Sequence, residues 1–101
     1  NYAAGFAREF LEFGESFRSP SHPIYMAFKN MVRDAGGRTS ASKTFFSQLK
    51  AEAKVMGHEI EVTKKTERGA GDYIGKFLMG ARLNEFGELL SVKKDDTSFD
   101  Y

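Results

Sequence analysis

The sequence has no cysteine and two histidines among its 101 residues, and both features exclude classes of site. Without cysteine, the chain has no disulfide framework and no thiolate metal site. His22 and His58 are isolated from each other and lack the neighbouring ligands that a metal centre needs. We therefore expect no metal and no cofactor. A reducing, cytoplasmic location suits a chain without cysteine.

Long hydrophobic runs are also missing. No apolar stretch approaches the roughly 18 residues that a membrane-spanning helix requires, so we expect no membrane partner. Charged residues interrupt the N-terminal stretch and exclude a recognisable signal peptide: Arg8, Glu9, Glu12 and Glu15. Because the chain begins with Asn1 instead of Met, we expect it to be part of a longer protein.

Motifs for catalysis are incomplete. In the glycine-rich stretch 69–75, Ala70 stands where a phosphate-binding loop needs glycine, and Ile74 interrupts the dinucleotide pattern. Phe77 follows the Gly-Lys pair where serine or threonine is required. Neither histidine has a serine and an acid at a spacing that suggests acyl transfer. We expect a non-catalytic binding domain, whose parent protein can still be an enzyme.

Positive charge is concentrated in the middle of the chain. Residues 24–83 carry eleven Lys and Arg against six Asp and Glu, whereas the flanking segments are weakly acidic and the whole chain has a net charge of +1. This distribution suits a polyanionic partner. The alternative is an ordinary solvated surface.

The N-terminal segment is predicted to be a helix from Ala3 to Phe17. Its phenylalanines recur at helical spacing: Phe6, Phe10, Phe13 and Phe17. This stripe belongs either to the core or to a docking face for another part of the parent protein. Residues 18–23 then form a linker, and Ser21 is a candidate N-cap for the next helix. Alternatively, the linker is disordered and the folded module begins at Pro23.

Two more helices follow, separated by a short turn that contains glycine. The second runs from Ile24 to Ala35 and ends at the Gly36-Gly37 pair. The third ends at Gly57, and its N-cap is one of three residues: Thr39, Ser40 or Ser42. This arrangement is typical of a helix-turn-helix.

The C-terminal half is predicted to contain a β-hairpin and a tail. Alternating residues indicate strands at His58–Thr66 and Tyr73–Leu83, joined by a flexible loop at Glu67–Asp72. A turn at Asn84–Gly87 leads to a tail at Glu88–Tyr101. The predicted organisation is a helix and linker at 1–22, a winged-helix domain at 23–87 and a flexible tail at 88–101.

The third helix carries two distinct faces. Apolar residues share one side: Phe45, Leu49, Ala53 and Met56. Cations and a hydroxyl share the opposite side: Lys43, Ser47, Lys50 and Lys54. A basic hairpin follows. These features predict an α+β winged helix-turn-helix of three helices and a two-stranded antiparallel wing. The expected core contains Phe28, Phe45, Leu49, Ile60, Phe77 and Leu83.

The elements from Ile24 to Leu83 resemble the C-terminal domain of phage and plasmid primase-helicases of the superfamily 3 helicase group. The matching stretches are Ile24–Lys29, Asp34–Gly36, Phe45 with Leu49-Lys50, and Lys76–Leu83. The resemblance implies a winged helix that binds origin or template DNA for a replication protein, in a bacterial host. Primase and helicase sites would lie elsewhere in the parent protein.

The predicted DNA-binding residues lie on the third helix and the wing: Lys43, Thr44, Ser47, Gln48, Lys50, Lys54, Lys64, Lys65 and Arg68. The helix would enter the major groove of double-stranded DNA. Gln48 would read a base, and the lysines would contact phosphates. The alternative function is a winged-helix module that docks a replication partner, with other domains of the parent protein as possible partners.

Overall fold

The computed structural model describes residues 2–92 and confirms the α+β class. Within this part of the chain the helices are α1 (Tyr2–Phe10), α2 (Ser21–Asp34), α3 (Ser42–Val55) and α4 (Glu85–Ser91). The strands are β1 (Leu11–Pro20), β2 (Glu61–Val62), β3 (Glu67–Arg68), β4 (Ile74–Gly75) and β5 (Phe77–Leu83). The sequence therefore predicts too few helices and too few strands.

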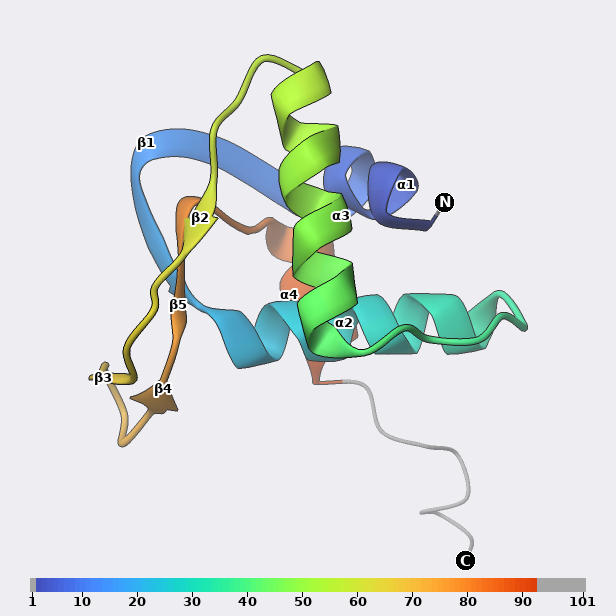
Figure 1. Ribbon diagram of the computed structural model, residues 1–101. Helices are drawn as coiled ribbons and strands as arrows, with labels where there is room; N and C mark the ends of the chain where they lie inside the picture. The colour runs from blue at the N-terminus through green and yellow to red at the C-terminus, as the bar shows by residue number, and fades with distance from the viewer. Residues whose placement is uncertain (1, 93–101) are drawn as a thin grey trace, which may run out of the picture.

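The sheet is built around β5, with β1 and β2 antiparallel on its two sides (Figure 1). β1 pairs Leu11 with Leu83 and Pro20 with Phe77, with a register shift in between. β3 and β4 form a separate antiparallel ladder beyond the end of the sheet (Figure 1). The sequence predicts one two-stranded hairpin. The structure instead has a three-stranded sheet and a separate two-stranded ladder.

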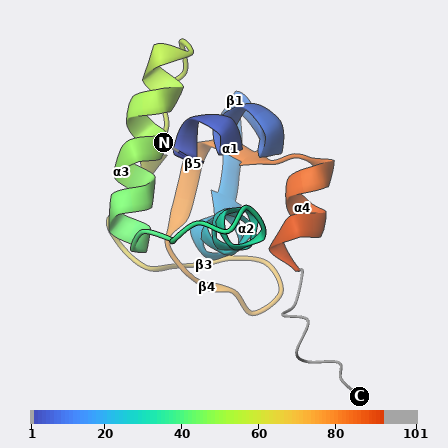
Figure 2. The same cartoon turned by 90° about the vertical axis from the view of Figure 1, so that its right-hand side faces the viewer.

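The helices pack in one group against the sheet. α1 and α2 lie between α3 and α4 (Figure 2). The rings of Phe28 and Phe45 stack with centroids 4.1 Å apart, and Phe6 packs edge-on against both. The expected core is confirmed for Phe28, Phe45, Leu49, Ile60 and Leu83, which belong to one buried cluster. Phe77 is also buried, but it lies beneath the Arg18 guanidinium, 3.7 Å from its ring centroid.

The prediction of one helix from Ala3 to Phe17 is wrong. The helix ends at Phe10, and the chain continues as β1. The phenylalanine spacing is compatible with a helix, but Gly14 weakens helical structure and β5 offers a long partner strand. Backbone pairing with a strand some seventy residues away therefore overrides the local pattern.

The predicted linker at 18–23 is also absent. β1 continues to Pro20 and α2 begins at Ser21, whose amide donates to the Lys76 carbonyl at 2.9 Å. α2 therefore crosses the predicted boundary between residues 22 and 23. Because Phe6 belongs to the same buried cluster as Phe45, the N-terminal segment is part of this core.

The predicted caps differ from those in the structure. Pro20, and not Ser21, occupies the N-cap position of α2, and Ala41 occupies that of α3. Neither position makes a side-chain cap hydrogen bond. The predicted C-terminal stops are confirmed, because Gly36 and Gly57 have positive φ angles of 77° and 90°.

The predicted turn and tail contain a helix. Asn84 caps α4, since its Oδ1 accepts from the Gly87 amide at 2.8 Å. The Leu90 carbonyl accepts from the buried Asn30 amide at 2.8 Å, which joins α4 to α2. The tail prediction is therefore wrong for Glu88–Ser91, and residues 93–101 lie outside the described part of the chain.

Candidate nucleic-acid interface

α3 has the two faces that its sequence predicts. Phe45, Leu49 and Ala53 are fully buried, and Met56 packs against the same core. All nine predicted DNA-binding residues are exposed. Burying the apolar side therefore leaves the polar side of α3 accessible to a partner.

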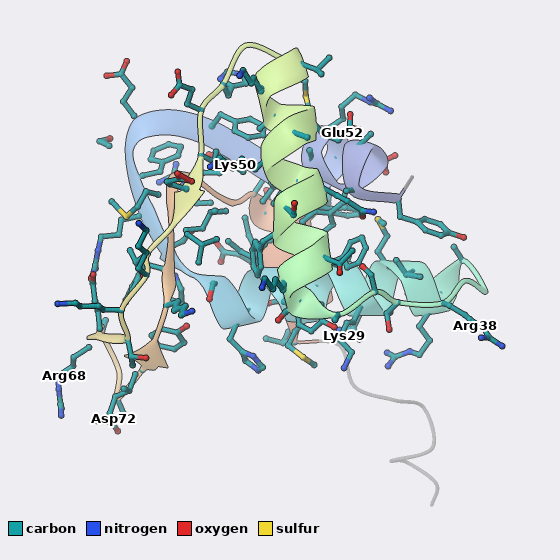
Figure 3. The ribbon with its side chains drawn as sticks, viewed as in Figure 1. Lys29, Arg38, Lys50, Glu52, Arg68 and Asp72 are labelled. Carbon is teal, nitrogen blue, oxygen red and sulfur yellow. The ribbon has the colours of Figure 1, made fainter. Side chains whose placement is uncertain are left out.

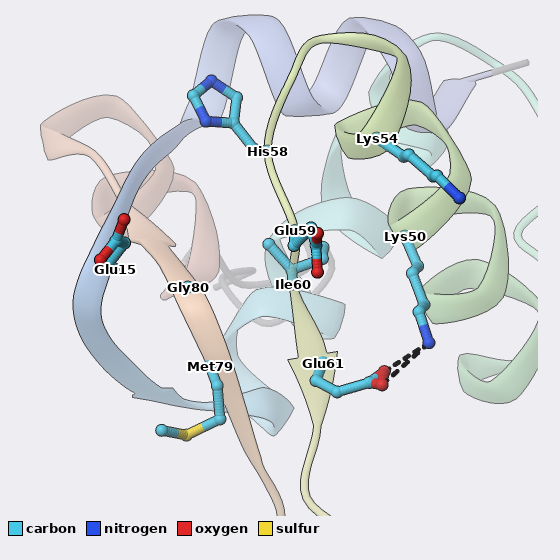
Figure 4. A pocket seen from close by; sticks show the side chains of 9 residues that line it. All are labelled: Glu15, Lys50, Lys54, His58, Glu59, Ile60, Glu61, Met79 and Gly80. Carbon is cyan, nitrogen blue, oxygen red and sulfur yellow. Dashed lines mark hydrogen bonds and ion pairs between the residues drawn. The ribbon is translucent and has the colours of Figure 1, made fainter.

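The two ends of the polar side of α3 have different electrostatic surroundings. Towards its C-terminal end, Lys50 and Lys54 line a hollow of about 460 Å³ next to β2 (Figure 4). The same hollow contains three carboxylates, from Glu15, Glu59 and Glu61. Negative groups therefore outnumber the lysines here, and the attraction for phosphate is weakened.

Lys50 makes a specific ion pair in this hollow. Its Nζ contacts both carboxylate oxygens of Glu61 and lies 2.9 Å from Oε2 (Figure 4). The side chains are 58% and 64% exposed, so the pair contributes about 0–1 kcal/mol and can be exchanged for a phosphate contact. Lys50 is thus a compensated cation in the free protein.

The N-terminal end of α3 borders a second hollow, which we call the lysine pocket. It has a volume of about 640 Å³ and is lined by residues from the starts of α2 and α3, from β2 and from the segments that flank β3 and β4. Lys43, Lys64 and Lys76 line it, together with His22. Among the described residues, no Asp or Glu lines this pocket, and no ion pair involves these lysines. The charges of these lysines are therefore uncompensated within the pocket.

The β3–β4 ladder is anchored to the sheet at its base. Arg18 of β1 forms an ion pair with Glu67 of β3, and the Tyr73 hydroxyl donates to the Lys76 carbonyl at 2.7 Å. The predicted loop is therefore wrong at its start, because Glu67 pairs with Gly75 across the ladder. Arg68 lies at the far end of this ladder, well away from Lys50 on α3 (Figure 3).

The structure brings together only part of the predicted surface. Lys43 and Lys64 share the lysine pocket, and Lys50 and Lys54 share the other hollow. The remaining predicted residues are exposed but line neither the lysine pocket nor the hollow beside Lys50: Thr44, Ser47, Gln48, Lys65 and Arg68.

Sequence reasoning gave no binding role to two basic residues of the lysine pocket, His22 and Lys76. The sequence places His22 in the predicted linker at 18–23 and Lys76 in the predicted strand Tyr73–Leu83, and neither position suggests a binding role. The charge of Lys76 and its position shortly after the basic predicted loop are the signals that could have indicated a binding role. Its nearness to Lys43 depends on how β5 packs beside α2, which no local pattern reveals.

The phenylalanine stripe is not an available docking face. Phe6 is fully buried, and Phe10 and Phe13 pack against the core. The Phe13 ring also stacks on His58, with centroids 4.4 Å apart. Exposed apolar residues instead lie on and just after α4: Phe86, Leu89 and Val92.

Comparisons with protein-family models, curated proteins and solved structures gave no match. Within residues 2–92, no group of three or more His, Asp or Glu side chains is arranged to hold a metal ion. None of the helices in that range is both long and apolar enough to cross a bilayer.

Proposed function

We propose that this chain is a winged-helix DNA-binding domain of a phage or plasmid replication protein of the primase-helicase type. In this proposal α2 and α3 are the helix-turn-helix, and residues 61–83 form the wing. The domain is a non-catalytic part of its parent protein and binds double-stranded DNA at an origin or template.

One observation carries the proposal: the uncompensated lysines at the start of α3 lie beside the wing. Lys43 comes from the helix, whereas Lys64 and Lys76 come from the two sides of the hairpin region. A winged helix uses the same two elements to hold adjacent parts of a duplex. The order of strands in the sheet, β1-β5-β2, is compatible with a wing that extends from β2 and β5.

The contacts divide into two roles. The lysines contact phosphates and supply affinity that does not depend on sequence. Gln48, exposed in the middle of α3, reads a base, since its amide can form two hydrogen bonds with adenine. Thr44 and Ser47 lie on the same accessible side and add hydroxyl contacts.

The direct test is a titration of a fluorescently labelled 20-base-pair duplex with the full chain, followed by anisotropy at several salt concentrations. We expect the logarithm of the association constant to fall linearly with the logarithm of the salt concentration. Each phosphate contact should contribute about −0.9 to this slope. Random and A·T-rich duplexes separate non-specific from specific affinity. Absence of binding to every duplex at low salt would refute the proposal.

The alternative function is docking of a replication partner. The side chains of Phe86 and Leu89 are apolar and are 65% and 67% exposed, which favours this function. They suit a docking surface better than the buried phenylalanine stripe does. The alternative takes precedence if the chain fails to bind duplex DNA in the titration.

A further inference from the structure

We propose that the lysine pocket is a binding site for a nucleoside monophosphate, either free or as the 5′-phosphorylated end of a nucleic-acid strand. This inference rests on the proposed function, because Lys43, Lys64 and Lys76 also carry the proposed duplex binding. Nucleotide and duplex titrations are measured separately, so the failure of one can be told from the failure of the other. Its volume of about 640 Å³ exceeds what a single ion needs and is in the range of pockets that hold small molecules.

The charge of the pocket selects an anion. Lys43, Lys64 and Lys76 line it, and among the described residues no Asp or Glu does. Like charges held around one cavity repel each other, and a phosphomonoester with a charge near −2 would relieve this repulsion. The positive end of the α3 dipole adds to the potential, because Lys43 is the second residue of that helix.

The aromatic residues of the pocket favour a ligand that carries a nucleobase beside the phosphate. Tyr25 and Phe46 line the pocket together with the lysines, and both are partly exposed while they also pack against the core. The Tyr25 hydroxyl donates to the Ser40 carbonyl at 2.7 Å, which holds this ring in place. Bases stack on such rings with little dependence on sequence.

The hollow beside Lys50 differs from the lysine pocket in its charge. Lys50 and Lys54 also line a cavity next to α3, but Glu15, Glu59 and Glu61 line it with them. A phosphate placed there would meet three carboxylates. The two cavities flank the same helix, so one provides a matched control for the other.

The test titrates the full chain with deoxyadenosine 5′-monophosphate, inorganic phosphate and deoxyadenosine. Calorimetry measures affinity, and ¹⁵N NMR identifies the amides that shift. We expect the monophosphate to bind more tightly than either of its parts and to shift amides at Lys43, Lys64 and Lys76. Failure of the monophosphate to shift these amides would overturn the proposal.

Variants assign the binding to the pocket. Lys43→Gln/Lys76→Gln removes both charges, keeps part of each aliphatic stem and should weaken monophosphate binding at least about tenfold, because two charge-assisted contacts are lost. Lys50→Gln/Lys54→Gln removes the same charge from the other hollow and should change affinity less than about twofold. Equal affinities of these two variants would overturn the proposal. Circular dichroism and thermal melts establish that both variants are folded.

A third variant tests the aromatic wall. Phe46→Leu should weaken binding of the monophosphate by about fivefold and leave binding of inorganic phosphate unchanged, because only the base stacks on the ring. An equal loss for both ligands would contradict a base-stacking role and overturn the nucleoside assignment.

Short single strands distinguish the two sources of the ligand. If a 5′-phosphorylated hexamer binds at least about fivefold more tightly than both the 5′-hydroxyl hexamer and the free monophosphate, the ligand is a strand end. If neither hexamer binds more tightly than the monophosphate, the ligand is the free nucleotide. Duplexes without 5′-phosphates lack the proposed pocket ligand, so their failure to bind would refute duplex binding and not the nucleotide site.

Discussion

Lys50 Nζ on α3 lies 2.9 Å from Glu61 Oε2 on β2, so a predicted DNA-binding lysine is neutralised by its neighbour. The pair is exposed and therefore weak. Its main consequence is electrostatic: the negative charge of Glu61 opposes the approach of a phosphate to this end of α3.

Glu61→Gln should raise affinity for duplex DNA. The substitution frees Lys50 for a phosphate contact and makes the slope of log affinity against log salt steeper by about 0.9. Anisotropy titrations at several salt concentrations measure both quantities. Glu85→Gln on α4, which lies on the other side of the helix group from α3 (Figure 2), removes the same charge and serves as control. An equal gain in both variants would attribute the effect to net charge alone.

The two hollows beside α3 should contribute unequally to duplex binding. Lys43→Ala/Lys64→Ala removes two uncompensated charges and should flatten the salt slope by roughly two. Lys50→Ala/Lys54→Ala should also weaken binding to all sequences, but with a smaller change in slope because Glu61 already neutralises Lys50. Wild-type affinity of both double variants at low salt would mean that α3 does not contact DNA.

Gln48→Ala should affect sequence preference and not overall affinity. Loss of a bidentate contact to adenine costs about 1–3 kcal/mol at a preferred site, while phosphate contacts are retained. Competition between the preferred duplex, found by selection from a random pool, and an unrelated duplex measures this difference. An unchanged preference would show that Gln48 does not read a base.

Leu49→Ala should destabilise the fold by roughly 2–5 kcal/mol, because Leu49 is fully buried between α3 and the rest of the core. Chemical denaturation followed by circular dichroism gives the free energy of unfolding. Val55→Ala on the same helix is the control, since Val55 is 83% exposed and should cost little. Similar losses for both variants would contradict the packing of α3.

Gly80→Ala should cost more stability than Gly36→Ala. Both glycines have positive φ, 97° and 77°, so alanine pays about 1–2 kcal/mol of backbone strain at each. Only at Gly80 would the new Cβ lie 2.6 Å from the Glu59 carbonyl oxygen, where overpacking adds about 1–3 kcal/mol. At Gly36 it meets no atom within 4 Å. Equal losses of unfolding free energy in the two variants would mean that β5 and the segment before β2 pack less closely than this distance indicates.

Features that depend on a few neighbouring residues were predictable from the sequence. The period of a helix separates Phe45 and Leu49 from Lys43 and Lys50, and burial confirms that separation. Gly36 and Gly57 end their helices because glycine adopts a left-handed conformation at low cost. α4 was missed although its signals are also local: Asn84 at the cap and Glu85 and Glu88 in the first turn.

Only the tertiary structure decided which elements are neighbours. Leu11–Pro20 is a strand because β5 pairs with it, and a strand's hydrogen bonds come from residues distant in sequence. The same packing sets Glu61 against Lys50 and gathers Lys43, Lys64 and Lys76 around one pocket. The sequence by itself determined which side chains of α3 face solvent. It could not determine which charges meet there, because electrostatic interactions depend on distances through space.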